Sequence, residues 1–219
     1  MQRNIKHYKQ IHNAMPEYGA GSRHFNFVFC ILVYLKARTA IDYGCGKGVL
    51  AEQVSRIPHL ECAKYDPAIP EHDLKPEAKF DCLVNTDVLE HIPEGELDAT
   101  LRDFPEISNQ AIVIPHLRKA KQILPNGENA HCTLKSPEQW REVLGKYYKN
   151  VVLLPHESER HALLLCTQTQ IDYEPLESAL QLIADRMSDR MLVQARLDDS
   201  LMQRVRRSGK LLLGPRALK

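Results

Sequence analysis

The segment 40–50, with the sequence AIDYGCGKGVL, constrains the fold more than any other part of the chain. A short apolar run ends in Asp42, and glycines follow at three alternate positions, Gly44, Gly46 and Gly48. Glycine reaches positive φ without a Cβ clash and lets a ligand approach the bare backbone. A segment with helical spacing begins directly afterwards and offers unpaired N–H groups to a polar or anionic group. The pattern therefore predicts a strand, a tight glycine turn and a helix, with a ligand bound at the turn.

The spacing of these glycines argues against a dinucleotide-binding site. A GxGxxG fingerprint requires its third glycine at position 49, which is valine here, so the chain has GxGxG instead. Two further carboxylates close the next apolar segments, Asp66 in AKYDPA and Asp87 in FDCLVNTDVLEHI. In an open α/β sheet the carboxyl ends of the strands form the ligand crevice. We therefore expect Asp42, Asp66 and Asp87 to converge beside the glycine turn.

The three motifs together resemble those of class I S-adenosylmethionine (SAM)-dependent methyltransferases. DYGCGKG, YDPA and DVLEHIP follow the order of the family's successive motifs, and the resemblance covers residues 40–167. It implies an α/β fold, a Rossmann-like doubly wound sheet with a C-terminal antiparallel strand, and SAM as the cofactor of a methyltransferase. The cofactor-binding residues implied by the resemblance are Asp42, Tyr43, Gly44, Gly46, Asp66, Pro67 and Asp87.

The apolar segments divide the chain into three parts. Residues 1–21 are polar and basic, with aromatic residues such as Tyr8, and we expect an N-terminal arm or a lid over the crevice. Residues 22–171 hold the SAM-binding methyltransferase domain. Residues 172–219 read as a helical C-terminal extension with an apolar stripe. Three possibilities remain open for that stripe: packing on its own domain, forming a homo-oligomer, or linking to a further domain.

Two details of the central domain are expected from local sequence. Between Asp66 and Phe80, three prolines leave too few residues for the family's usual third strand and helix, so that unit should be trimmed. The adenine contacts that this unit usually supplies would then fall to Asp73 and Leu74. Residues 151–155 and 162–166 are apolar and flank the polar stretch HESER, which predicts a hairpin at one edge of the sheet.

Composition narrows the class of protein. The chain has 219 residues, 43% of them hydrophobic, which suffices for one α/β domain. Its 29 basic and 28 acidic residues provide no global attraction to nucleic acid or to an anionic membrane, so any such contact must be local. The resemblance favours a small-molecule or glycan acceptor and leaves nucleic acid possible. Six cysteines are scattered without a CxxC pair, and the longest apolar run falls well short of the ~20 residues that span a bilayer. We expect a cytoplasmic protein with no membrane span.

Histidines on loops are the candidates for catalysis. Methyl transfer from a sulfonium requires mainly that donor and acceptor be oriented, and that a hydroxyl acceptor lose its proton. All three candidates lie on loops at the carboxyl edge of the sheet: His91 and His116 each follow an expected strand, and His131 precedes a capped helix. We place His131 first as the general base, because it ends a long loop and a capped helix starting at Ser136 supports it. His91 is the second candidate.

Looser similarities suggest the acceptor. YDPA, NTDVLEHIP and the loop LPNGENAH before a tryptophan-containing helix resemble methyltransferases encoded with bacterial surface-polysaccharide genes, which favours a sugar or glycan hydroxyl and a role in polysaccharide biosynthesis. Asp87, Glu90 and His91 also resemble the metal-binding signature of small-RNA 3′-terminal ribose 2′-O-methyltransferases. No downstream partner is recognisable, so we assign no metal ligand and keep metal-dependent RNA ribose 2′-O-methylation as an alternative. A non-catalytic SAM-binding module that binds partners through the C-terminal helix is a further alternative.

Overall fold

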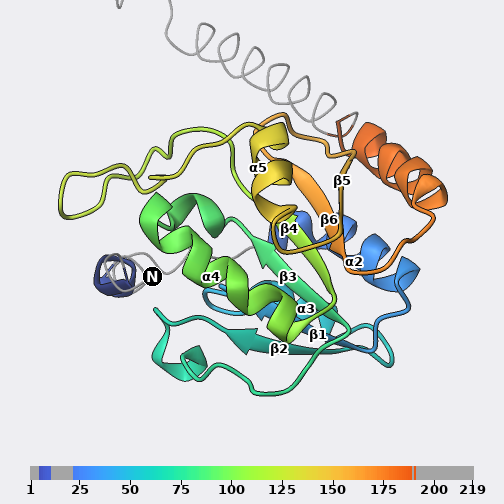
Figure 1. The fold of residues 1–219 in the computed structure, drawn as a ribbon, viewed down its shortest axis with the longest axis horizontal. Coiled ribbons are helices and arrows are strands. Elements are labelled where there is room, and N and C mark those ends of the chain that lie inside the picture. Colours follow the sequence, from blue (N-terminus) through green and yellow to red (C-terminus); the bar gives the residue numbers. More distant parts are fainter. Residues whose placement is uncertain (1–4, 11–21, 189, 191–219) are drawn as a thin grey trace, which may run out of the picture.

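One six-stranded sheet organises the protein. A computed structural model describes residues 5–10, 22–188 and 190, and every structural statement below concerns these residues. The strand order is β2-β1-β3-β4-β6-β5 (Figure 1). The strands are β1 (Thr39–Tyr43), β2 (Glu61–Tyr65), β3 (Cys82–Thr86), β4 (Gln110–Ile114), β5 (Asn150–Leu154) and β6 (Leu163–Thr167). β1 to β4 are mutually parallel, and β6 pairs antiparallel with both β4 and β5. The predicted Rossmann-like sheet with a C-terminal antiparallel strand is confirmed.

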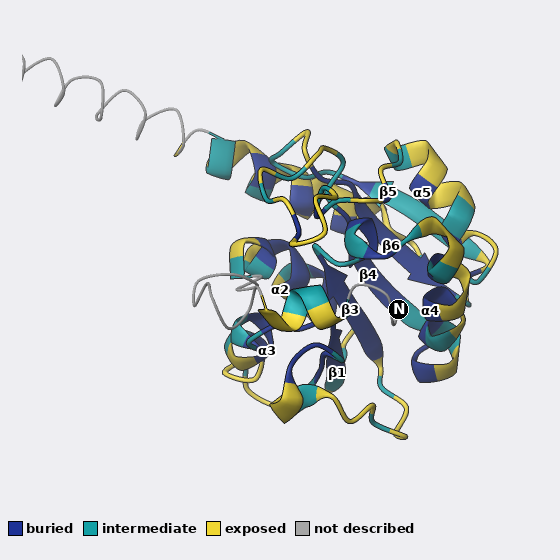
Figure 2. Ribbon diagram, turned by 90° about the vertical axis from the view of Figure 1, so that its left-hand side faces the viewer, coloured by how far each residue is buried: buried dark blue, intermediate teal, exposed yellow. Residues whose placement is uncertain are grey.

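Helices cover both faces of this sheet, as Figures 1 and 2 show. The α-helices with defined bounds are α2 (Phe25–Tyr34), α3 (Val49–Val54), α4 (Glu94–Ile107) and α5 (Pro137–Leu144). Short 3₁₀ turns occur at η1 (Ser22–His24), η2 (Pro70–His72) and η3 (Leu89–His91). α2, α3 and a helix over 174–188 pack on one face, and α4 and α5 pack on the other. Every residue of β3 and β6 is buried, which is typical of strands covered on both faces.

The trimmed third unit is confirmed. Between β2 and β3 the chain forms only η2, and β2 is therefore an edge strand. Pro70 begins η2, where its missing N–H costs no hydrogen bond. Leu74 follows η2 with 85% of its surface exposed.

The predicted hairpin is also confirmed, and its direction matters for the site. β6 is inserted between β4 and β5, so β5 is the outer strand. β5 runs in the same direction as β4, because β6 is antiparallel to both. The turn from β5 into β6, residues 155–162, therefore lies at the carboxyl edge of the parallel strands, together with the glycine turn.

The described part of the C-terminal helix packs on its own domain. Leu176, Leu180 and Ala184 are buried against α2 and the sheet, and the partly buried Ile183 and Met187 border them. Residues 191–219, on which the expectations of a homo-oligomer or a linked domain depend, lie outside the described residues, as do residues 11–21 of the N-terminal arm.

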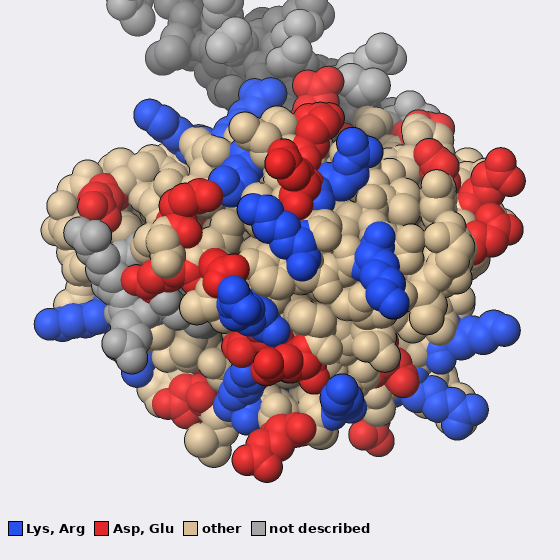
Figure 3. All heavy atoms as spheres, viewed as in Figure 1, with Lys and Arg blue, Asp and Glu red and all other residues tan. Residues whose placement is uncertain are grey.

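The surface offers no single-sign region on the face drawn in Figure 3, where basic and acidic side chains are interspersed. This distribution agrees with the near-balance of charge in the sequence. Within the described chain, no helix combines the length and the apolarity needed to cross a membrane.

The glycine turn gives a stability prediction. Gly44→Ala should lower the free energy of unfolding by about 2–4 kcal/mol, because alanine must adopt a φ of +86° and its Cβ would lie 2.4 Å from Cγ2 of Val88. Gly127→Ala is the matched control, since it has a φ of +83° but no described atom within 4 Å of the added Cβ, so it should lose only ~1–2 kcal/mol. Urea denaturation measures both values. Equal losses would show that the contact with Val88 does not constrain the turn.

Candidate functional site

The glycine turn joins the ends of β1 and β2 through backbone hydrogen bonds and one carboxylate. Gly44, Gly46 and Gly48 all have positive φ, between 52° and 86°. The N–H groups of Gly44 and Cys45 donate to the carbonyl of Tyr65 over 2.7 and 3.1 Å. Asp66 accepts from the N–H of Gly46 and from its own turn at Ala68, both over 2.8 Å.

This bracing role of Asp66 is not predicted from sequence. The resemblance assigns Asp66 to the cofactor, where a carboxylate suits the two hydroxyls of a ribose, and in the structure each of its two oxygens accepts from one backbone N–H. A carboxylate oxygen has a second lone pair, so each can still accept from a ligand hydroxyl. Pro67, also expected at the cofactor site, is half-buried in the turn that follows.

Asp42 and Tyr43 point to opposite faces of β1. Asp42 is 2% exposed, and burial, followed by the nearby charge of Asp66, raises its pKa to about 7. Tyr43 is fully buried on the α4 side, where its hydroxyl donates to Asp103 over 2.8 Å. Its carbonyl accepts from the side chain of Asn85 over 2.7 Å. Only the backbone of Tyr43 thus lies at the predicted cofactor site.

Six histidines form a continuous group at the same edge of the sheet. Their neighbouring ring centroids lie 4.7–5.4 Å apart. We call this group the histidine cluster, and its members are His24, His91, His116, His131, His156 and His161. His91 and His131 were predicted as catalytic and His116 was considered with them, whereas His24, His156 and His161 were missed. The last two lie in the turn from β5 into β6.

Burial keeps much of this cluster neutral. Desolvation is the main cause that lowers the pKa of His91 and His116 to about 4 and that of His156 to about 3, with neighbouring histidines adding to it. Burial also lowers the pKa of His131. At neutral pH these rings therefore offer lone pairs and N–H groups and carry no charge.

Glu90, His91 and His131 form one compact set within the cluster. One candidate ligand atom from each lies within 4.8 Å of the others. Glu90 is fully buried, and neither of its carboxylate oxygens makes an aligned hydrogen bond with the described residues, although the backbone N–H groups of Glu90 and His116 lie near enough to stabilise the charged form. Burial and the charge of Asp87 raise the pKa of Glu90 well above its ordinary value. A buried carboxylate without an aligned hydrogen bond, facing two imidazoles, is an arrangement that a cation would stabilise.

The tautomers of the two histidines can be read from their neighbours. The Nδ1 atom of His131 lies 2.5 Å from the carbonyl oxygen of Arg118, and that of His91 lies 2.9 Å from the carbonyl of Ala130. A carbonyl only accepts, so each Nδ1 carries a proton and each Nε2 is left with its lone pair. Nε2 of His131 lies 4.0 Å from Oε1 of Glu90.

The loop before α5 fixes His131 in place. Asn129 bonds both the N–H and the carbonyl of Ala120, and its Oδ1 accepts from the N–H of His131 over 3.0 Å. The predicted capping box at Ser136 is present and starts α5. Tyr8, in the short helix over 5–10, donates to the carbonyl of Ala130 over 2.8 Å, and its hydroxyl lies 2.9 Å from Nδ1 of His91. The N-terminal arm thus touches the cluster at Tyr8.

Asp87 contacts two members of the histidine cluster, His24 and His161. Its Oδ2 lies 3.1 Å from Nε2 of His24 and 3.5 Å from Nε of Arg23, and its Oδ1 lies 3.2 Å from Nε2 of His161. Although burial raises the pKa of Asp87, the contacts with His161 and His24 outweigh it and hold that pKa below the usual range. Asp87 has a φ of 55°, which is uncommon for a residue with a side chain.

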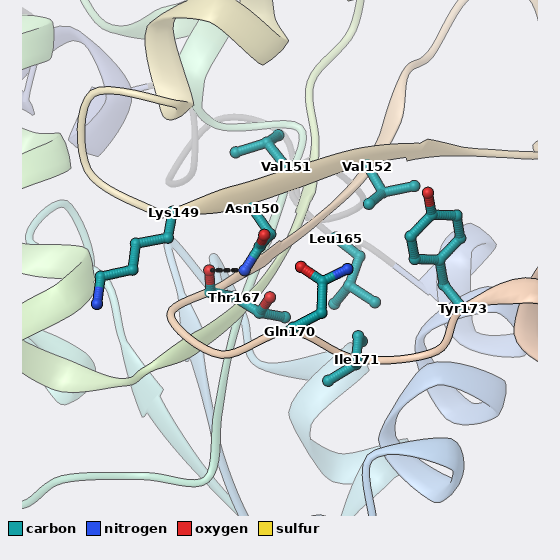
Figure 4. A pocket seen from close by; sticks show the side chains of 9 residues that line it. All are labelled: Lys149, Asn150, Val151, Val152, Leu165, Thr167, Gln170, Ile171 and Tyr173. Carbon is teal, nitrogen blue, oxygen red and sulfur yellow. Dashed lines mark hydrogen bonds between the residues drawn. The ribbon is translucent and has the colours of Figure 1, made fainter.

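A separate cavity lies at the opposite end of the sheet. It has a volume of about 280 Å³ and opens beside the start of β5, where Asn150, Thr167 and Tyr173 are among its lining residues (Figure 4). β5 begins at the amino edge of the parallel strands, so this cavity does not adjoin the glycine turn.

Comparisons with known proteins agree with this geometry. Residues 17–147 match the family described as methyltransferase domain. No curated protein is similar enough in sequence to count as a match.

Three solved structures illustrate the likeness in fold. The methyltransferase domain of bacterial CtHen1 is 16% identical, with a TM-score of 0.51 over 68% of this chain and 99% of that one. Human N-acetylserotonin methyltransferase in complex with SAM is 15% identical, with a TM-score of 0.54; the alignment covers 77% of this chain and 57% of that one. A Burkholderia thailandensis 1,6-didemethyltoxoflavin-N1-methyltransferase with bound S-adenosylhomocysteine is 14% identical, with a TM-score of 0.50; the alignment covers 76% of this chain and 85% of that one. At these identities the likeness concerns the fold.

The family match spans more than half of the chain and includes the glycine turn, Asp42, Asp66 and the segment that ends in His91. The sheet order and the inserted antiparallel strand agree with it. The chain therefore belongs to the methyltransferase-domain family, with a Rossmann-like fold and SAM as its cofactor.

Proposed function

We propose that this protein transfers the methyl group of SAM to a hydroxyl of a sugar or glycan. The observation that supports the proposal is the set of neutral imidazoles and buried carboxylates at the same edge as the glycine turn. A neutral hydroxyl group is a weak nucleophile until it loses its proton. A hydroxyl acceptor therefore needs a base or a cation beside the methyl donor.

His131 is the proposed general base. Its Nδ1–H donates to the carbonyl of Arg118, which leaves the lone pair of Nε2 free to accept the proton of the acceptor hydroxyl. Burial lowers the pKa of this ring, so it is unprotonated at neutral pH and ready to act. Asn129 and the capped start of α5 hold it rigidly, as a positioned base requires.

The same group of residues supports a second candidate, metal-dependent methylation of an RNA ribose 2′-hydroxyl. The downstream partner that sequence alone did not reveal is His131, which lies with Glu90 and His91. Two Nε2 lone pairs and a carboxylate without an aligned hydrogen bond among the described residues suit a divalent cation, and both Nδ1–H groups bond to carbonyls as in metal-bound histidines. A cation held there would lower the pKa of a coordinated hydroxyl.

SAM affinity should depend on pH through Asp42. In the free protein the pKa of Asp42 is about 7, so the carboxyl is largely protonated below that value. We assign Asp42 to the ammonium group of the ligand, which requires the carboxylate, so affinity should fall as pH drops from about 7 to about 5.5, by up to ~10-fold per unit. Over this range the ligand's amine stays protonated.

Calorimetry at several pH values measures this dependence. Asp42→Asn should bind SAM more weakly and show a flat profile, since the amide does not titrate. The same slope in wild type and variant would remove Asp42 from this role.

His131→Gln tests the base assignment. Turnover should fall by ~10²–10⁴, the usual contribution of a positioned base, while SAM affinity stays within about twofold. His116→Gln is the matched control, because His116 also belongs to the histidine cluster but its replacement should reduce turnover much less. Steady-state rates with a methylatable glycan acceptor provide the comparison, and a His131→Gln enzyme that keeps most of its turnover would contradict the assignment.

Chelation separates the two candidate functions. A histidine-base enzyme should keep its rate after treatment with EDTA. If the rate is lost and returns with a divalent ion, and if an RNA 3′ end is methylated where glycans are not, the metal-dependent ribose reaction is the correct function. Loss of activity that no divalent ion restores would support neither route, since it would indicate damage to the fold.

A further inference from the structure

We propose that His24, Asp87 and His161 form a binding site for a divalent transition-metal ion of the zinc class. These three residues come from three separate parts of the chain: the end of η1, the residue after β3, and the turn before β6. One donor atom from each lies within 4.8 Å of the others. Asp87 also belongs to the signature with Glu90 and His91 described in the sequence, but in the structure the compact set of Glu90, His91 and His131 is a separate group of donors.

The spacing of the donor atoms suits a small ion. Nε2 of His24 lies 3.1 Å from Oδ2 of Asp87, and Nε2 of His161 lies 3.2 Å from Oδ1. Donors that share a tetrahedral zinc ion at ~2.0–2.2 Å are separated by ~3.3–3.6 Å. Small side-chain movements would therefore admit the ion, without any rearrangement of the backbone.

Unmet hydrogen bonding points to a missing ligand. The side chain of His161 is 6% exposed, and its Nδ1 has no hydrogen-bond partner in the described part of the chain. Nε2 of His161 and Oδ1 of Asp87 lie 3.2 Å apart, but neither makes a hydrogen bond of good alignment. Buried polar atoms are normally hydrogen-bonded. A metal ion that binds the lone pairs of Nε2 of His161 and Oδ1 of Asp87 would explain why these two atoms are not.

A neighbouring histidine restricts the orientation of the proposed ligand His24. Nδ1 of His24 lies 3.3 Å from Nε2 of His156, and Nδ1 of His156 accepts from the backbone N–H of Ser158 over 3.1 Å. The proton of the neutral His156 ring is therefore on Nε2, which also lies 3.3 Å from Oε2 of Glu157. These contacts hold the His156 ring against His24, and groups that orient a ligand in this way support metal binding.

The donor set selects the class of ion. Two imidazoles and one carboxylate suit zinc and similar divalent transition metals better than magnesium, which prefers oxygen ligands. Three protein ligands leave a fourth position open to water or a hydroxyl. One positive charge already competes for the site, since Nε of Arg23 lies 3.5 Å from Oδ2 of Asp87, on a side chain that is 64% exposed.

Metal content tests the proposal independently of enzymatic activity. Full-length protein is stripped with chelator and titrated with zinc, with Co²⁺ as a spectroscopic probe, and bound metal is counted by mass spectrometry. Wild type should bind zinc, and His161→Gln should weaken that binding by about 100-fold or more, because loss of an outer partner alone costs ~10–100-fold. The cobalt spectrum should lack thiolate charge-transfer bands, which excludes the exposed Cys132 as the ligand.

Matched variants keep the outcome interpretable. His131→Gln should retain the zinc ion that His161→Gln loses, and this contrast separates the site from the Glu90 set and from the proposed function. Arg23→Gln should tighten zinc binding several-fold by removing the competing charge. His161→Gln alters a buried side chain of the turn, so His156→Gln, which leaves all three donors in place, serves as a milder variant with a predicted loss of ~10–100-fold. The proposal is overturned if wild type binds no zinc, or if folded His161→Gln and His156→Gln bind it as tightly as wild type.

Discussion

The carboxylate of Asp66 carries the constraint on which the site depends. It bonds the N–H of Gly46 in one turn and of Ala68 in the next, and so joins the end of β1 to the end of β2. Charge-assisted bonds of this kind are stronger than neutral ones. They hold three residues of positive φ in a tight turn, which brings bare backbone to the carboxyl edge. The proximity of Asp66 also helps to keep Asp42 protonated near neutral pH.

Buried polar side chains occupy the rest of the carboxyl edge of the sheet. The loops after β3 and β4 and the turn into β6 each place polar side chains there, and six imidazoles pack ring to ring. Desolvation leaves several of these rings neutral, so they supply lone pairs for protons or cations. The carboxylate of Glu90 and Nδ1 of His161 make no aligned hydrogen bond with the described residues, which is costly for buried polar atoms. Unsatisfied hydrogen-bonding atoms at the carboxyl edge of a methyltransferase sheet indicate that this region binds ligands and is not only packed core.

Local signals in the sequence predict much of this structure. The glycine turn, the proline-shortened third unit, the capping box at Ser136 and the β5–β6 hairpin depend on residues close together in the chain, and the structure confirms them. The orientation of Tyr43 could also have been predicted, because neighbours on a strand face opposite sides and Asp42 was placed at the ligand. His24, His156 and His161 could not be recognised singly. Each is a lone histidine, and only the direction of β5 and the placement of α2 bring them to Asp87.

A crystal structure with S-adenosylhomocysteine bound tests the central claim most directly, because it locates the methyl donor relative to the histidine cluster. The account predicts the ribose diol on Asp66, the amino group near Asp42, and the sulfur directed toward Glu90 and His131. Adenine should lie against the exposed Leu74, which the trimmed third unit leaves beside the crevice. A ligand whose sulfur faces away from the cluster, or one bound in the cavity beside Asn150, would contradict it.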